Sequence, residues 1–227
     1  MTASLGVVML ETRFPRPRGD IGNPATFAFP VRYRTVRGAS PRRVVVERDA
    51  TLLAPFIEAA QALARDGVAA VTTSCGFLAL FQREMADALA VPVWTSSLLL
   101  VAELEAAWGD ARRVGVVTAD AASLSVDHLA AVGARPDTPI EGLGLATRFR
   151  ATLLDDGAEL DGAEAEAATV AAARRLVERH PEVAAIVLEC TNMPPYAAAV
   201  RAATGRPVHD ITTLVRARLA GAADSAS

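Results

Sequence analysis

The sequence predicts an α/β protein with two pseudo-symmetric lobes, each holding a mainly parallel sheet flanked by helices. Two observations lead to this fold class. Short apolar segments alternate with amphipathic helical patterns along the chain, which is typical of parallel sheets with helical connections, and the second half of the sequence partly repeats the first. We expect lobes over 1–110 and 111–227, with the chain free to cross back between them, and a site in the cleft that separates them.

Apolar runs bounded by polar or turn-forming residues predict the strands, which in chain order are Leu5–Leu10, Val68–Thr73, Val91–Trp94, Arg113–Thr118, Val183–Leu188 and Pro207–His209. Apolar residues at helical spacing predict helices between them, over Leu52–Arg65, Leu78–Leu89, Leu98–Ala107, Ala121–Val132, Glu164–His180 and Pro195–Thr204. The segment 13–43 is rich in proline, glycine and arginine, and we expect it to form an ordered loop over the cleft. Residues 220–227 are expected to form a frayed tail.

The internal repeat relates the only two cysteines of the chain. Shifting the sequence by 115 residues aligns Gly67–Cys75 with Glu182–Cys190, and Pro92-Val93 then falls on Pro207-Val208. Each cysteine lies just after a predicted buried strand, at the start of the next helix. Binding sites of parallel sheets form at this edge. A pseudo-two-fold relation between the lobes would therefore bring both thiols to one small volume.

Composition excludes several classes of site. All 23 basic residues are arginine, so neither a pyridoxal-phosphate Schiff base nor a Walker lysine is available. The histidines and cysteines lack metal-ligand spacing. A net charge of −3 gives no reason to expect nucleic acid or a membrane surface as a partner, and no apolar run approaches the roughly 20 residues of a membrane span. We expect a cytoplasmic protein without cofactor or metal, and a homodimer is compatible with the sequence.

Two opposed thiols are suited to proton transfer at carbon. A helix start favours the thiolate through its unpaired N–H groups. One thiolate then removes the α-proton of a small carboxylate substrate, and the other thiol donates a proton to the opposite face. The same N–H groups can hold the carboxylate. The competing interpretation, that Cys75 and Cys190 are small buried hydrophobes, is weakened by their pairing at equivalent strand ends.

The motifs Thr-Ser-Cys75-Gly and Glu-Cys190-Thr-Asn-Met resemble those of the aspartate/glutamate racemase superfamily. The resemblance extends from Leu5 to about Val215. It implies two pseudo-symmetric α/β lobes, paired cysteine bases and no cofactor, and an amino-acid racemase or epimerase as the activity.

Other activities of the superfamily stay open. Glu11-Thr12-Arg13 and Cys190-Thr191-Asn192 differ from the glutamate racemase motifs, which argues against glutamate, and Cys-Thr-Asn is similar to the maleate isomerase motif. A maleate-type cis–trans isomerase or a malonate decarboxylase would use one cysteine. A third alternative is a non-catalytic protein that binds a small acid.

The predicted substrate-binding residues lie in the loop 13–43 or at the expected sheet edge, and they are Asn23, Thr73, Ser74, Gly76, Phe77, Thr118, Thr191 and Asn192. Ser74 is also a candidate helix cap. A second group of residues has either a structural role or a role in substrate binding. This group consists of Glu11, Thr26, Asp120, Glu189 and His209. Glu189 adjoins Cys190, where it would tune the proton affinity of that thiol.

Overall fold

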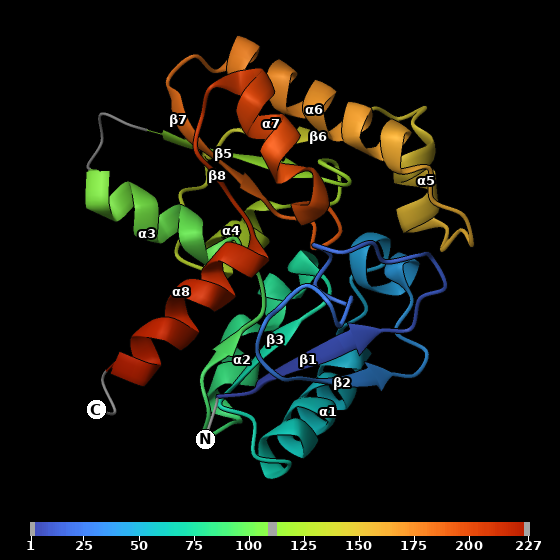
Figure 1. Ribbon diagram of the computed structural model, residues 1–227, viewed down its shortest axis with the longest axis vertical. Helices are drawn as coiled ribbons and strands as arrows, with labels where there is room; N and C mark the ends of the chain where they lie inside the picture. The colour runs from blue at the N-terminus through green and yellow to red at the C-terminus, as the bar shows by residue number, and fades with distance from the viewer. Residues whose placement is uncertain (1–2, 109–112, 225–227) are drawn as a thin grey trace.

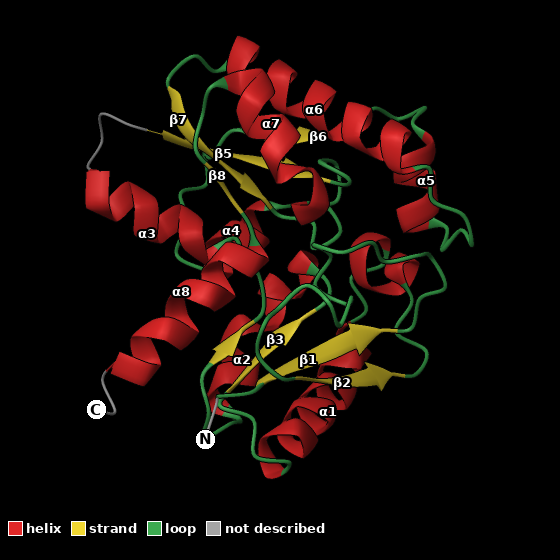
Figure 2. Ribbon diagram, viewed as in Figure 1, coloured by secondary structure: helices red, strands yellow, loops and turns green. Residues whose placement is uncertain are grey.

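The computed structural model describes residues 3–108 and 113–224, and these form two four-stranded parallel sheets flanked by helices (Figure 1, Figure 2). The first sheet has the strand order β2-β1-β3-β4 and consists of β1 (Leu5–Leu10), β2 (Val31–Val36), β3 (Ala70–Thr73) and β4 (Val93–Trp94). The second has the order β6-β5-β7-β8 and consists of β5 (Arg113–Thr118), β6 (Ile140–Gly142), β7 (Val183–Leu188) and β8 (Val208–His209). The equivalent strand orders confirm the predicted pseudo-symmetric α/β fold.

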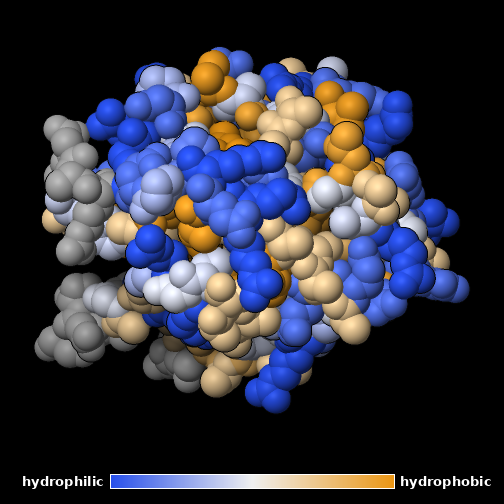
Figure 3. All heavy atoms as spheres, turned by 90° about the horizontal axis from the view of Figure 1, so that it is seen from above, coloured by the Kyte–Doolittle hydropathy of each residue, from blue (hydrophilic) through white to orange (hydrophobic). Residues whose placement is uncertain are grey.

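The helices are α1 (Leu53–Arg65), α2 (Gln82–Asp87), α3 (Leu99–Trp108), α4 (Val126–Ala131), α5 (Arg148–Leu154), α6 (Gly162–Arg179), α7 (Ala197–Thr204) and α8 (Ile211–Asp224). Short 3-10 helices occupy Ala50–Leu52, Gly76–Phe81 and Pro194–Tyr196, and a π-helical turn occupies Arg42–Val46. In Figure 1, α1 lies against the first sheet, and α6 and α7 lie above the second. The face seen from above is largely hydrophilic, with apolar residues in small separate groups (Figure 3).

Strand burial follows position in the sheet. Every residue of β1 is buried, because parallel strands in the middle of a sheet are covered on both faces. The edge strand β2 instead alternates half-buried Val31 and Tyr33 with exposed Arg32 and Arg34. The prediction of one loop over 13–43 is therefore wrong for residues 31–36, which pair in parallel with β1.

The last helix returns to the first sheet. Ile211, Leu214 and Leu219 of α8 pack in one apolar cluster with Leu5 and Trp94. Residues 220–224 continue this helix, so the prediction of a frayed tail is wrong there, and 225–227 lie outside the described residues. The predicted lobe boundary near residue 110 also falls outside them.

Two helices begin differently from the prediction. The segment expected as one helix over Leu78–Leu89 begins as a 3-10 helix at Gly76 and continues as α2. Helix α4 begins at Val126 because Ser125 and His128 form a reciprocal capping box there. Neither α5 nor β6 was expected from the sequence. Within residues 3–108 and 113–224, no helix combines the length and the apolar character that crossing a membrane requires.

Candidate active site

The two cysteines occupy equivalent positions. Cys75 lies two residues after β3, in extended conformation, and precedes the 3-10 helix Gly76–Phe81. Main-chain N–H groups of Phe77 and Leu78 point to its thiol. Cys190 lies two residues after β7, and the N–H of Asn192 points to its thiol. Each strand thus delivers its cysteine to the carboxyl edge of its sheet, where the chain turns into a short helix.

Direct contacts join the two cysteine loops. The hydroxyl of Thr191 donates a hydrogen bond of 2.6 Å to the main-chain oxygen of Ser74, while Ser74 Oγ accepts one of 2.9 Å from the N–H of Leu10. Gly76 packs against Glu189, and a Cβ at position 76 would lie 2.8 Å from Glu189 Cδ and closer still to Oε1 and the main-chain oxygen. Because glycine lacks this atom, the two loops can approach closely.

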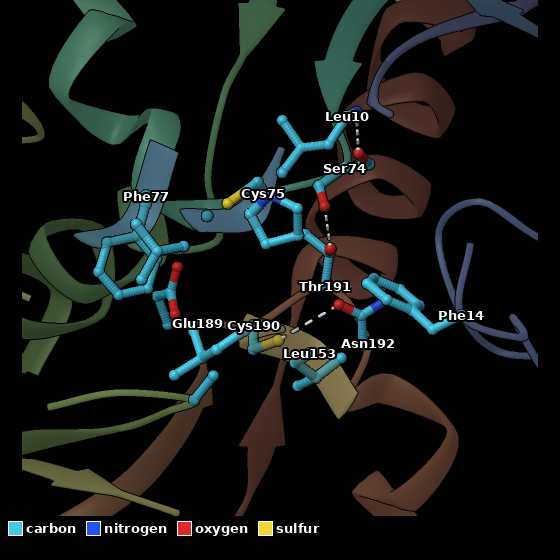
Figure 4. Close-up of a pocket in the computed structure, with 15 residues that line it drawn as sticks. Leu10, Phe14, Ser74, Cys75, Phe77, Leu153, Glu189, Cys190, Thr191 and Asn192 are labelled. Atoms are coloured by element: carbon cyan, nitrogen blue, oxygen red, sulfur yellow. Dashed lines mark hydrogen bonds between the residues drawn. The ribbon is translucent and has the colours of Figure 1, made fainter. Parts of the chain in front are cut away.

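Both thiols line a single narrow cavity with an accessible volume of about 30 Å³ (Figure 4). Ser74, Gly76, Glu189, Thr191 and Asn192 also line it. The remaining wall is apolar and consists of Leu10, Phe14, Pro41, Val45, Phe77, Ala119, Leu153 and Leu154. The cavity therefore suits a small molecule whose polar groups are met at a few defined points.

Burial favours the protonated form of both thiols. Burial raises the pKa of Cys75 to about 12, with a further increase from the Glu189 carboxyl, while the N–H of Phe77 opposes the shift. Burial likewise raises the pKa of Cys190 well above its ordinary value, with Glu189 as the next cause and Cys75 as a smaller one. The helix starts act in the direction expected from the sequence, but loss of solvation outweighs them. A favourable charge placed beside the sulfur atoms would lower the pKa of both thiols.

Glu189 is fully buried and lies beside both thiols. Its Oε2 accepts a hydrogen bond of 2.7 Å from Thr118 Oγ1, and its Oε1 has no hydrogen-bond partner among the described residues. Burial raises the pKa of this carboxyl to about 7, against the opposing effect of Thr118. Figure 4 shows the carboxyl next to the Phe77 ring, at a level between the two sulfur atoms.

A buried network orients Asn192. Its Nδ2 donates a hydrogen bond of 2.6 Å to Asp20 Oδ2, so its Oδ1 turns to the Cys190 sulfur, 3.5 Å away. Asp20 is itself held by an ion pair of 2.9 Å with Arg16, whose guanidinium lies 4.8 Å from the centre of the Phe14 ring. The loop after β1 thereby supplies both a cavity wall and the group that fixes the Asn192 amide.

Several predicted site residues lie outside the cavity wall but support it. Thr73 Oγ1 donates to the main-chain oxygen of Thr95, and Thr118 holds Glu189. Asn23 Nδ2 donates to the main-chain oxygen of Arg16, and Thr26 Oγ1 donates to that of Asp20. These side chains order the strand ends and the loop after β1, and their predicted substrate contacts stay predictions.

Three more predicted residues lie away from the cavity lining. Glu11 accepts a hydrogen bond from the N–H of Gly38, Asp120 forms an ion pair with Arg150, and His209 is half-buried on β8. Phe14, Leu153 and Asp20 were not predicted from the sequence. An apolar wall carries no motif, and the role of Asp20 depends on a contact between segments that are 172 positions apart.

No group of three or more histidine, cysteine or acidic side chains within residues 3–108 and 113–224 is placed to hold a metal ion. The reactive groups that line the cavity are the two thiols and the Glu189 carboxyl.

Sequence comparison finds several relatives. The chain is 32% identical over 222 residues to a dimethylsulfoniopropionate lyase of Durusdinium sp. clade D, covering 92% of this chain and 71% of that relative. It is 32% identical over 233 residues to dimethylsulfoniopropionate lyase 3 of Emiliania huxleyi (strain CCMP1516), covering 98% of this chain. The chain spans 60% of the length of that second relative. No family model matches the chain.

Structure comparison identifies proteins of the same fold. The allantoin racemase of Klebsiella pneumoniae aligns with a TM-score of 0.67 at 16% identity, covering 99% of this chain and 89% of that one. Unliganded arylmalonate decarboxylase aligns with a TM-score of 0.61 at 19% identity, covering 97% of this chain and 93% of that one. At these identities the likeness concerns the fold.

Proposed function

Because the chain belongs to the dimethylsulfoniopropionate lyase family within the aspartate/glutamate racemase superfamily, we propose that it cleaves dimethylsulfoniopropionate or a closely similar onium carboxylate by elimination. The observation that carries the proposal is the pair of thiols in one small cavity, each two residues after the end of a buried strand. The names of the relatives supply the reaction class. The thiols supply groups that exchange protons at carbon.

The reaction needs one base and no oxidant. A cysteine thiolate removes a proton from the carbon next to the carboxylate, and those electrons form the carbon–carbon double bond. The carbon–sulfur bond then breaks, and its electron pair leaves with dimethyl sulfide. The products are dimethyl sulfide, acrylate and a proton on the cysteine, which is later released to solvent. Main-chain N–H groups of Phe77 and Asn192 point to the thiols and favour the thiolate form of the base.

The first test measures product from purified protein and dimethylsulfoniopropionate, with headspace gas chromatography for dimethyl sulfide and proton NMR for acrylate. Replacing the cysteine that acts as the base, by Cys75→Ala or Cys190→Ala, should lower kcat by about 10²–10⁴, the usual contribution of a positioned acid/base. Full activity in both single variants would contradict the proposal.

A second candidate is 1,1-proton transfer, the racemisation or epimerisation of a small α-carboxylate. It is favoured by the presence of both thiols on one cavity, since elimination needs only one base. Incubation with D- and L-amino acids in deuterated water, followed by chiral analysis, separates the two functions. Racemisation labels the α-position and leaves the carbon skeleton intact, whereas elimination releases an alkene.

A further inference from the structure

The Glu189 carboxyl is a buried acid without a cationic partner. It is fully buried, its Oε1 has no hydrogen-bond partner, and among the described residues no ion pair involves it. A buried, unpaired carboxylate is costly. An acid retained in this state at a cavity wall is therefore a candidate for contact with a ligand.

The other residues that line the cavity favour a ligand with a positive group over a ligand with a second negative group. No arginine or histidine lines the cavity among the described residues, and Glu189 is the only ionisable lining group besides the two thiols. Phe14 and Phe77 contribute aromatic rings to the wall, and aromatic faces attract cations. A dicarboxylic acid would bring its second carboxylate close to Glu189, whereas an onium group would neutralise that charge.

Taking the proposed function as its basis, we propose that Glu189 determines substrate specificity by pairing its carboxylate with the cationic head of an onium carboxylate. The substrate carboxylate then lies away from Glu189, because two like charges repel each other. The carbon that loses its proton lies between these two ends, within reach of the thiols. Specificity thus arises from charge at one wall of a cavity that is otherwise apolar.

The pairing also activates the base. Glu189 is the second cause, after burial, of the raised pKa of both thiols. A cation beside Glu189 cancels the negative charge that opposes thiolate formation and adds a favourable charge of its own. A bound onium substrate therefore lowers the pKa of the thiol that acts as the base.

The two thiols and His128 keep their charge state near neutral pH. Burial holds the pKa of both thiols above neutrality. Behind the Phe77 ring, 5.2 Å from ring centre to ring centre, burial lowers the pKa of His128 to about 4. Asp20 is paired with Arg16. The carboxyl of Glu189 is thus the group near the cavity that changes charge close to pH 7.

The test compares two unreactive ligands of nearly equal shape by calorimetry. Protonated 3-(dimethylamino)propionate carries a cation where 4-methylpentanoate carries a neutral CH group. Above pH 7, wild-type protein should bind the cationic ligand at least about tenfold more tightly, and Glu189→Gln should remove this preference, since about 1.4 kcal/mol corresponds to a factor of ten. Glu178→Gln, at an exposed position of α6, is the matched control and should keep it.

A second variant keeps the carboxylate and covers the case in which Glu189→Gln does not fold. In wild-type protein, affinity for the cationic ligand should rise with pH through about 7 as Glu189 ionises. Thr118→Val removes the hydrogen bond that stabilises the carboxylate and should move the midpoint of that rise to higher pH. Circular dichroism and thermal melting establish that each variant is folded.

The outcomes separate this inference from the proposed function. A charge preference that depends on Glu189, without release of dimethyl sulfide, supports the cation site and removes the lyase. Lyase activity with an unchanged charge preference in Glu189→Gln supports the lyase and overturns the cation site. Three other results also overturn the cation site. They are equal affinity of wild-type protein for the two ligands, binding of neither ligand, and an unchanged midpoint of the pH dependence of affinity in Thr118→Val.

Discussion

Gly76→Ala tests whether the close contact between the two cysteine loops sets the geometry of the site. The new Cβ would meet Glu189 at Cδ, Oε1 and the main-chain oxygen. The main-chain oxygen cannot turn away as a side chain can, because the N–H of Glu189 is bound to Val117 O at 2.8 Å. Overpacking lowers the free energy of unfolding by about 1–3 kcal/mol. We expect a loss at the upper end of this range, because the new Cβ meets backbone as well as side-chain atoms. For a chain of this size, a loss of about 3 kcal/mol lowers Tm by about 6–12 °C.

The same change should impair catalysis more than stability alone explains. Residue 76 directly follows Cys75, so movement of the loop changes the position of one thiol relative to the other, and a misplacement near 1 Å costs about 10²-fold in rate. Differential scanning calorimetry and dimethyl sulfide release measure the two effects. The control is Gly162→Ala, where an added Cβ meets open space. If the two variants had the same Tm and activity, the argument from close approach would be refuted.

Three further predictions concern buried charge. Asp20→Asn should lower the free energy of unfolding in urea by about 3–5 kcal/mol, because it leaves Arg16 without its buried partner. An unchanged urea midpoint would contradict the stabilising role of this ion pair. Burial lowers the pKa of His128 from 6.5 to about 4, so the stability due to its neutral form is complete above pH 6.5 and declines as pH falls toward 4. In His128→Gln, the plot of Tm against pH should be flatter over this range than in wild-type protein. Parallel plots for the two proteins would contradict this prediction. Glu189 has the opposite sign, because its carboxyl pKa is raised from 4.5 to about 7. Its stabilisation is present below pH 4.5 and is lost as pH rises through 7, a loss that Glu189→Gln should abolish in the same measurement.

The sequence predicts strands best where burial is most complete. The runs at Leu5–Leu10, Arg113–Thr118 and Val183–Leu188 coincide with β1, β5 and β7, because strands covered on both faces are continuously apolar. The edge strand β2 was assigned to a loop because its arginines face solvent. Helix α8 did carry a signal: Ile211, Leu214 and Leu219 lie at helical spacing and were overlooked beside an alanine-rich end.

At the site, the repeat predicted the position of both cysteines but not their protonation. Placement follows from topology, since equivalent strands deliver equivalent residues to facing sheet edges. Protonation depends on how much solvent the finished fold excludes and on the approach of Glu189 to Gly76. Neither quantity is visible in the motifs. The orientation of Asn192 by Asp20 has the same origin, a contact between the loop after β1 and the second cysteine loop.

One fold can serve racemases and lyases because the two reactions share their first step. In both, a base removes the proton next to a carboxylate, and negative charge develops on that group. The reactions then differ in what the substrate carries: a second acid returns a proton to the opposite face, or a leaving group departs from the neighbouring carbon. Two thiols alone do not distinguish these outcomes. In this cavity the distinguishing feature is the wall around Glu189, where an unpaired carboxyl and aromatic rings favour a substrate whose leaving group is a cation.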